Sequence, residues 1–492
     1  MALDPGLRRL ALQTLLAAFT GKSAPDWALR LLDDGLAGHT LFGFNIAEPE
    51  QVARLTAELR GARSDTLIAI DEEGGDVTRL AHLTGSPYPG NAALGAVDDL
   101  DLTRLVYGAI GSDLAAAGIN LDLAPTVDVN TAEDNPIIGT RSFGADPLTV
   151  ARHSAAAIAG LQGLGVAACA KHFPGHGATV TDSHLELPTI APLPVLRERD
   201  LPPFAAVVAA GAQAIMTAHL RVPGLTGDGP ATFSKAVLTD LLRHDYGFSG
   251  VVVTDALEMT GASGPAGGIG KAAVLALAAG ADLLCIGAKV DHALVEAVVA
   301  EIVAGVRDGR LPLDRLENAA ERTATMAAWT RRPAAALPHD AALGYAGLGY
   351  AALGYAAARR AVQVEGSLVD LTAPLVVQLE SGFSIAEGRV PWGLKPHLNG
   401  VEQVDVVAAE ASINALADRA GARPIVVVGR HAHRTAATRA LIERLAASHT
   451  VAVVEMGWPS AWRPTGARAF VTTYGASHAN GRAAAEALGL AR

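Results

Sequence analysis

The sequence is poor in cysteine, in aromatic side chains and in positive charge. Its 492 residues include only two cysteines. Cys169 and Cys285 stand alone in apolar runs and form no CxxC pair, which argues against a disulfide framework and a structural zinc knuckle. The 39 basic residues are outnumbered by 50 acidic ones, so a nucleic acid or an anionic membrane is not the expected main partner.

Long uncharged apolar runs are also missing. No window of about 18 residues has the composition of a membrane span. The stretch 10–19 follows Arg8 and Arg9 like the start of a signal peptide, but Gln13 and Thr14 interrupt it and no small-x-small cleavage site follows. We therefore expect a short helix and a buried strand there, a cytoplasmic location and no membrane partner.

Half of the residues are hydrophobic and 18% are charged, a composition that is typical of a folded protein with a sizeable core. Apolar runs of four to six residues without polar alternation recur in the first 290 positions, as in strands buried on both faces. They alternate with segments of helical periodicity, which predicts a (β/α)8 barrel over residues 1–333. An open doubly wound sheet is the alternative, but no early GxGxxG turn supports it. The eight runs are 15–19, 40–44, 66–71, 119–123, 166–171, 214–219, 251–255 and 282–286.

The composition changes after the predicted barrel. Residues 334–358 contain a five-residue repeat with Tyr345, Tyr350 and Tyr355 at matching positions, and we interpret this segment as a linker or a helix lead-in. Beyond it, five apolar runs alternate with helical segments, which predicts a smaller α/β sandwich domain over 359–492. The expected fold class is therefore α/β, a TIM-like barrel followed by a sandwich.

Ionisable residues gather at the carboxyl ends of the predicted barrel strands, where the active sites of such barrels lie. They are Asp71, Asp122, Lys171, His172, His219 and Asp255. Asp255 ends the seventh run, where it is suited to act as a nucleophile or a general base, or alternatively to cap the next helix. Arg79 lies in the loop after Asp71, and Arg141 lies in the loop after the fourth run, where it is suited to hydrogen-bond a hydroxyl or amide oxygen. The alternative is that these arginines pair with aspartates and only brace their loops.

The densest polar cluster is KHFPGHGATVTDSHLELP, residues 171–188. Pro174 and its neighbouring glycines disfavour a helix, so we expect a loop over the barrel mouth. Its histidines and Asp182 could ligate a metal ion. In the alternative that we favour, Asp182 holds one nitrogen of His184 and leaves the other for proton transfer.

These segments together resemble family 3 of the glycoside hydrolases, in its β-N-acetylhexosaminidase branch. Residues 241–255 match the nucleophile signature of the family, and KHFPGHG…DSH is typical of the branch. The resemblance covers about 330 residues strongly and the remainder weakly. It implies Asp255 as catalytic nucleophile and His184 as acid/base oriented by Asp182. It also implies that Asp71, Arg79, Arg141, Lys171 and His172 bind the N-acetylglucosamine unit. Glu72 and Asp76 depart from the residues common in the branch.

The resemblance implies a retaining exo-β-N-acetylglucosaminidase that forms a covalent glycosyl-enzyme and needs no metal or other cofactor. The expected partner is a small carbohydrate, with peptidoglycan fragments from cell-wall recycling as a candidate source, and the oligomeric state stays open. Alternatives are a phosphorylase or β-glucosidase of the same family, a metal-dependent barrel hydrolase, and a non-catalytic sugar-binding protein.

Overall fold

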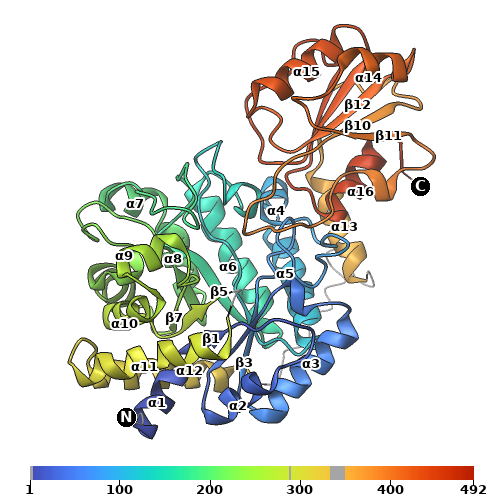
Figure 1. The fold of residues 1–492 in the computed structure, drawn as a ribbon. Coiled ribbons are helices and arrows are strands. Elements are labelled where there is room, and N and C mark those ends of the chain that lie inside the picture. The colour runs from blue at the N-terminus through green and yellow to red at the C-terminus, as the bar shows by residue number, and fades with distance from the viewer. Residues whose placement is uncertain (1–3, 288–289, 333–348, 492) are drawn as a thin grey trace. The chain divides into compact units, whose positions relative to one another are not determined.

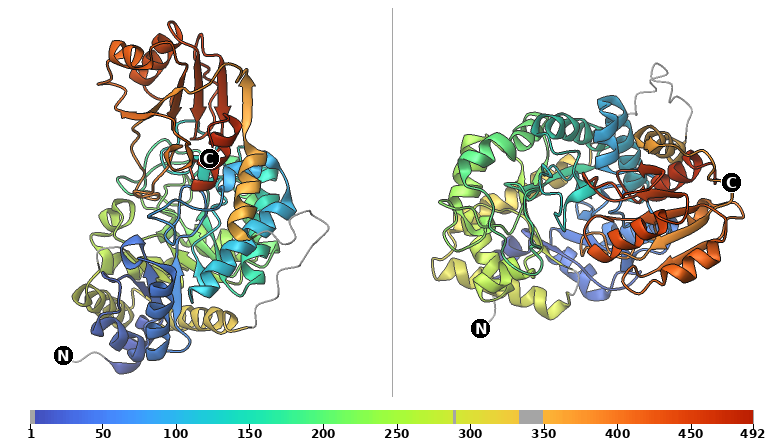
Figure 2. Two further views of the ribbon diagram at one scale, coloured as in Figure 1. Left: turned by 90° about the vertical axis from the view of Figure 1, so that its right-hand side faces the viewer. Right: turned by 90° about the horizontal axis from the view of Figure 1, so that it is seen from above.

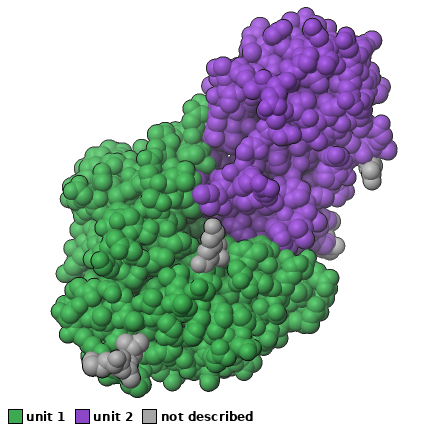
Figure 3. Space-filling view, in the orientation of Figure 1, with its two compact units in different colours: residues 1–72, 103–136, 145–338 green, residues 73–102, 137–144, 339–492 purple. Residues whose placement is uncertain are grey.

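The computed structural model describes residues 4–287, 290–332 and 349–491 (Figure 1). The chain divides into two compact units (Figure 3). The first unit comprises Met1–Glu72, Thr103–Pro136 and Ala145–Pro338, and the second comprises Glu73–Leu102, Ile137–Gly144 and His339–Arg492. Each unit has its own sheet and its own apolar core.

The first unit is built on eight parallel strands, which confirms the predicted barrel. Consecutive strands pair along the chain, and β8 pairs with β1. A parallel bridge between Val253 and Leu283 joins β7 to the residue that precedes β8 and closes the ring. The strands are β1 (Leu15–Ala17), β2 (Gly38–Leu41), β3 (Leu67–Ile70), β4 (Leu121–Asp122), β5 (Ala167–Phe173), β6 (Ala214–Thr217), β7 (Val251–Thr254) and β8 (Leu284–Ile286).

Alternate residues of these strands form the interior of the barrel. Leu67 and Ala69 of β3, Ala167 and Cys169 of β5, and Val251 and Val253 of β7 belong to one buried apolar cluster. The spacing of two follows from strand geometry, in which successive side chains point to opposite faces. Both cysteines are buried in this cluster as free thiols, so they serve as small apolar residues.

Helices surround the strands of the barrel (Figure 2). Several begin at capping side chains, such as Asp146, whose carboxylate accepts the Thr149 N–H at 2.7 Å at the start of α6. The segment 10–19 contains the end of α1 and strand β1, as expected. The helices are α1 (Pro5–Leu12), α2 (Asp26–Asp34), α3 (Pro49–Ala62), α5 (Leu100–Ala116), α6 (Pro147–Gly163), α7 (Leu193–Arg199), α8 (Pro202–Ala209), the π-helix η4 (Ala236–Asp245), α9 (Thr260–Ala266), α10 (Ile269–Ala279), α11 (His292–Arg307) and α12 (Leu313–Trp329).

The second unit is an α/β sandwich around a six-stranded sheet in the order β11-β10-β12-β13-β14-β9. Only β9 runs antiparallel to its neighbour in this sheet. The strands are β9 (Gln363–Gly366), β10 (Leu375–Leu379), β11 (Gln403–Val406), β12 (Ile425–Gly429), β13 (Val451–Glu455) and β14 (Ala469–Thr472). The helices are α4 (Asn91–Val97), α13 (Tyr350–Ala361), α14 (Ile413–Ala420), α15 (Ala436–Ala446) and α16 (His478–Ala487).

Both faces of this sheet are buried. Val426 and Val428 of β12 pack on the side of α16, whereas Ile425 and Val427 of the same strand pack on the side of α14 and α15. Burial on both faces explains why the central strands read as continuous apolar runs. The fold class predicted from the sequence is confirmed in both units.

Two segments from the first half of the sequence belong to the second unit: Glu73–Leu102, which ends at the start of α5, and Ile137–Gly144, which follows β4. Helix α4 packs against α13, and Arg360 of α13 forms an ion pair with Asp99 at 2.8 Å. The carbonyl of Pro87 lies where a side chain at Gly354 would be, so the two backbones approach closely. Most of the predicted linker, through residue 348, lies outside the described residues, and its last part is helix α13. Among the described helices, none has the length and apolar content needed to span a bilayer.

A buried ion cluster at the amino end of β8 predicts a large effect on stability. The buried Asp282 carboxylate accepts the Val252 N–H at 2.8 Å and pairs with both Arg243 and Arg315. The change Asp282→Ala leaves two partly buried guanidinium groups uncompensated, so the free energy of unfolding should fall by about 3–5 kcal/mol.

Urea denaturation followed by circular dichroism measures this change. Asp308→Ala is the matched control, because Asp308 forms an exposed ion pair with Arg310 and its loss should shift the midpoint far less. Equal midpoints for the two variants would contradict the assigned role of Asp282.

Candidate active site

Three ionisable side chains continue the inward-facing positions of the barrel strands. Asp71 follows Leu67 and Ala69, Lys171 follows Ala167 and Cys169, and Asp255 follows Val251 and Val253, each at a spacing of two. The alternation that buries the apolar residues therefore directs these three charged groups to the mouth of the barrel, at the carboxyl ends of its strands.

Asp71 and Lys171 form an ion pair there. The Lys171 Nζ lies 2.8 Å from Asp71 Oδ1, and the lysine side chain is 3% exposed while the aspartate side chain is 19% exposed. The pair thus presents a carboxylate edge to the barrel mouth while the ammonium group is covered. The side chain of Asp122 points to the opposite side of its strand, away from this inward-facing set. It is fully buried and accepts the Glu72 N–H, and burial raises its pKa well above the usual value.

Asp128 binds the end of β5 and the start of the loop that follows it. Its buried carboxylate accepts the backbone N–H groups of His172 and His176 and lies 2.7 Å from His172 Nδ1. Burial alone would raise the pKa of Asp128, but the adjacent His172 and His176 outweigh it and hold the pKa below its usual value. Asp128 is therefore ionised and fixes the His172 ring with Nδ1 as the donor.

His176 connects this anchor to the residues beyond it. Its Nδ1 lies 2.7 Å from the Thr179 hydroxyl and its Nε2 lies 3.0 Å from the Ser183 hydroxyl. Burial lowers the pKa of His176 to about 4, so the ring is neutral near pH 7 and its two nitrogens bind one partner as donor and the other as acceptor. The ring thereby ties residues 179–183 to the barrel.

Asp182 and His184 form a hydrogen-bonded dyad on this loop. The Asp182 carboxylate lies 2.7 Å from His184 Nδ1 and accepts the His184 backbone N–H at 2.8 Å. Burial opposes ionisation of Asp182, but its bonds to His184 outweigh this effect and keep its pKa below the usual value. A carboxylate on Nδ1 fixes the tautomer and orientation of the ring and stabilises the imidazolium form.

Asp255 stands directly after β7, opposite several imidazoles. Burial opposes its ionisation, but the neighbouring His219, His172 and His184, together with the Ala256 N–H at 2.8 Å, lower its pKa below the usual value. The His219 Nε2 lies 3.1 Å from the Ala256 carbonyl, which requires that nitrogen to be the donor. Asp255 is therefore a carboxylate that remains ionised and partly accessible.

The dyad loop packs against the segment that follows Asp255. The Thr260 N–H, at the start of α9, donates to the His184 carbonyl at 3.4 Å. At Gly261 an added Cβ would lie 3.0 Å from the Ser183 carbonyl, so the loop and the helix approach closely. The structure thus brings the dyad and Asp255 to the same part of the barrel mouth, together with Asp71, Lys171 and His172.

The two predicted arginines belong to the second unit. Arg141 is buried and forms a bidentate pair with Glu73, at 3.0 Å from Nε and 2.8 Å from Nη2, and its Nη1 donates to the Ile137 carbonyl. Arg79 donates to the backbone carbonyls of Ala386 and Glu387. These contacts orient both guanidinium groups within that unit.

Sequence reasoning missed Asp128 and Glu73 as partners of site residues. Asp128 lies between Val127 and Val129, and this apolar flanking of a single carboxylate in a loop was the available signal. Nothing local in the sequence pairs Glu73 with Arg141, 68 positions away. Within the described ranges, no group of three or more His, Cys, Asp or Glu side chains has a geometry that would hold a metal ion.

The chain is similar to known glycoside hydrolases over most of its length. Residues 12–326 match the model of the glycosyl hydrolase family 3 N-terminal domain. A β-N-acetylglucosaminidase of this family from Paenibacillus sp. has a similar structure, with a TM-score of 0.86 and 33% identity over 100% of this chain and 98% of that one.

Sequence relatives include two bacterial enzymes. A β-hexosaminidase of Stenotrophomonas maltophilia is 39% identical over 279 residues, 55% of this chain and 81% of that one. β-Hexosaminidase A of Pseudoalteromonas piscicida is 38% identical over 251 residues, 46% of this chain but 42% of the longer relative. Because the family model matches the residues that form the barrel, the chain belongs to glycosyl hydrolase family 3.

Proposed function

We propose that this chain is a retaining exo-β-N-acetylglucosaminidase, which removes terminal β-linked N-acetylglucosamine through a covalent glycosyl-enzyme. The observation that carries the proposal is an ionised Asp255 at the barrel mouth next to the loop that bears the Asp182–His184 dyad. The names of the relatives, β-hexosaminidase and β-N-acetylglucosaminidase, support the sugar class.

In the first step, an Asp255 carboxylate oxygen attacks the anomeric carbon as the bond from that carbon to the leaving oxygen breaks. His184, as an imidazolium, donates its Nε2 proton to the departing oxygen, while its Nδ1–H remains bonded to Asp182. The negative charge of Asp182 stabilises the imidazolium before transfer, because Asp182 is itself held ionised.

In the second step, neutral His184 accepts a proton from water at Nε2 as the water oxygen attacks the anomeric carbon. The bond to Asp255 breaks, the carboxylate is regenerated, and the sugar leaves with the configuration it had in the substrate. One residue acts first as acid and then as base, so the enzyme returns to its starting protonation state.

The Asp71–Lys171 pair and His172 are the proposed sugar-binding groups of the barrel rim. The partly exposed Asp71 carboxylate can accept hydrogen bonds from two adjacent sugar hydroxyls, with Lys171 compensating its charge. For Arg79 and Arg141, which belong to the second unit, the family resemblance implies the same ligand, N-acetylglucosamine. We further propose that the substrate comes from peptidoglycan fragments and that the reaction takes place in the cytoplasm, which the sequence composition and the family resemblance support.

The substrate class is tested with two aryl β-glycosides that differ only at the 2-position. We expect the acetamido compound to be cleaved with a kcat/KM at least roughly 100-fold above that of the hydroxyl compound, because a site built to bond an amide discriminates against its absence. Comparable values for the two substrates would indicate a glucosidase instead.

The role of Asp255 is tested by Asp255→Asn, which keeps the shape of the side chain but removes the charge. The kcat for the acetamido substrate should fall by at least roughly 10³-fold, since the covalent step is lost. Asp228→Asn, in an exposed loop, is the control and should keep its activity. In addition, a 5-fluoro derivative of N-acetylglucosaminyl fluoride should leave a mass adduct on the peptide that contains Asp255; an adduct on another peptide would refute the assignment.

The role of His184 is tested by His184→Ala with substrates of graded leaving-group acidity. Alkyl glycosides, whose leaving oxygen needs the proton, should lose about 10²–10⁴-fold in kcat/KM, whereas dinitrophenyl glycosides should lose much less in the glycosylation step. His244→Ala, at a largely exposed position, serves as the control. Equal losses on both substrate classes would argue against an acid role.

A further inference from the structure

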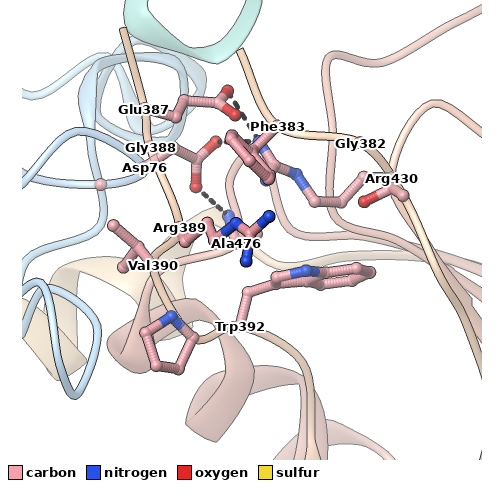
Figure 4. A pocket seen from close by; sticks show the side chains of 13 residues that line it. Asp76, Gly382, Phe383, Glu387, Gly388, Arg389, Val390, Trp392, Arg430 and Ala476 are labelled. Carbon is pink, nitrogen blue, oxygen red and sulfur yellow. Dashed lines mark hydrogen bonds and ion pairs between the residues drawn. The ribbon is translucent and has the colours of Figure 1, made fainter. Parts of the chain in front are cut away.

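The second unit contains a cavity of about 360 Å³ that the proposed hydrolysis does not use. Its size is near the lower end of the range for ligand pockets, roughly 300–1,000 Å³, which suits one monosaccharide-sized molecule. Figure 4 shows the side chains around it. The lining residues are Gly75, Asp76, Ser381, Gly382, Phe383, Glu387, Gly388, Arg389, Val390, Pro391, Trp392, Arg430 and Ala476.

The two carboxylates of this pocket are already neutralised by protein groups. Asp76 accepts the Ala476 N–H at 2.7 Å and the Thr140 hydroxyl at 2.6 Å. Arg430 Nη2 lies 2.8 Å from Glu387 and 3.3 Å from Asp76. Because these oxygens are engaged, the acids of the pocket do not require a cationic ligand.

Some hydrogen-bond donors of this pocket, in contrast, have no acceptor within the described residues. The Arg430 side chain is 8% exposed, and its buried Nε has no hydrogen-bond partner within the described residues. The same holds for the Ser381 hydroxyl. Arg389 is exposed and forms no ion pair with any carboxylate in the described part of the chain; its guanidinium lies 5.2 Å from the centre of the Phe383 ring. The two buried donors without an acceptor indicate a ligand rich in acceptors, and the cation of Arg389 without a protein carboxylate favours a negatively charged one.

Aromatic rings lie beside these donors. Phe383 is 51% exposed, and Trp392 packs under the Arg430 guanidinium at 5.7 Å while remaining partly accessible. An exposed large apolar ring next to hydrogen-bond donors is suited to a molecule with an apolar face and a polar edge. A sugar ring, with its C–H face and its hydroxyl oxygens, has this character.

We propose that this pocket binds a monosaccharide that carries a carboxylate. The carboxylate pairs with the Arg389 guanidinium, the ring packs on Phe383 and Trp392, and ring or hydroxyl oxygens accept from Arg430 Nε and Ser381 Oγ. The inference concerns binding by the second unit and does not depend on the proposed hydrolase activity.

Isothermal titration of the full chain with glucuronate, glucose and acetate tests the proposal. Glucuronate and glucose differ only in the carboxylate, and acetate is a carboxylate without a ring. We expect glucuronate to bind at least roughly ten-fold more tightly than either, since a charge-assisted contact and the ring contacts act together. The affinity should fall as salt is raised.

Two variants assign the binding to this pocket. Arg389→Gln should weaken glucuronate binding by at least roughly ten-fold. Arg444→Gln, an exposed arginine of α15 with no pairing in the described structure, is the matched control and should leave the affinity unchanged. Trp392→Leu should weaken glucuronate but not acetate.

Three outcomes would overturn the proposal. Equal affinities for glucuronate and glucose would show that the pocket does not recognise the carboxylate. Equal affinities for glucuronate and acetate would show that it does not recognise the sugar ring. Absence of glucuronate binding, or binding unaffected by Arg389→Gln, would show that this pocket is not the site.

Discussion

The buried carboxylate of Asp128 holds the active-site region of the barrel together. It accepts two backbone N–H groups and one imidazole N–H from the end of β5 and the loop that follows, so a charge that would be costly to bury is fully bonded. Through His176 the same anchor reaches Thr179 and Ser183, next to the dyad. A loop with several glycines and a proline is thus tied to a rigid strand end by side-chain bonds rather than by secondary structure.

The proposed chemistry depends on this arrangement because acid and nucleophile come from elements of different stiffness. Asp255 is placed by the backbone of β7, whose neighbours fix it on both sides. His184 is placed by Asp182 and by the contact of its carbonyl with the first turn of α9. In the proposed mechanism a strand end supplies the nucleophile Asp255, whose position must be constant. A loop supplies His184, which donates a proton in the first step and accepts one in the second.

Charges at the barrel mouth are arranged in compensated pairs. Lys171 with Asp71, His172 with Asp128 and His184 with Asp182 each combine a cationic or titratable group with a carboxylate. Asp255 has no such single partner in the set, and it is kept ionised by several imidazoles at once. A carboxylate stabilised by distributed charge rather than by one tight ion pair keeps an oxygen available for attack on carbon.

The sequence by itself predicted the eight barrel strands and placed Asp71, Lys171 and Asp255 at the carboxyl ends of their strands. These features follow from short continuous apolar runs, which are typical of strands buried on both faces and whose ends can be read from the sequence. The dyad was also predictable, because Asp182 and His184 lie two positions apart. Strand β9 was missed because QVEG is a fully exposed edge strand without an apolar run.

Only the tertiary structure decided the remainder. It brought Asp128 within hydrogen-bonding distance of His172, 44 positions away. It also grouped residues 73–102 and 137–144 with the C-terminal residues in the second unit. It also assembled the pocket around Arg389 from segments separated by about 300 residues. A pairing between single polar residues leaves no periodic pattern along the chain, so its partner is selected by packing and by the cost of an unpaired buried charge.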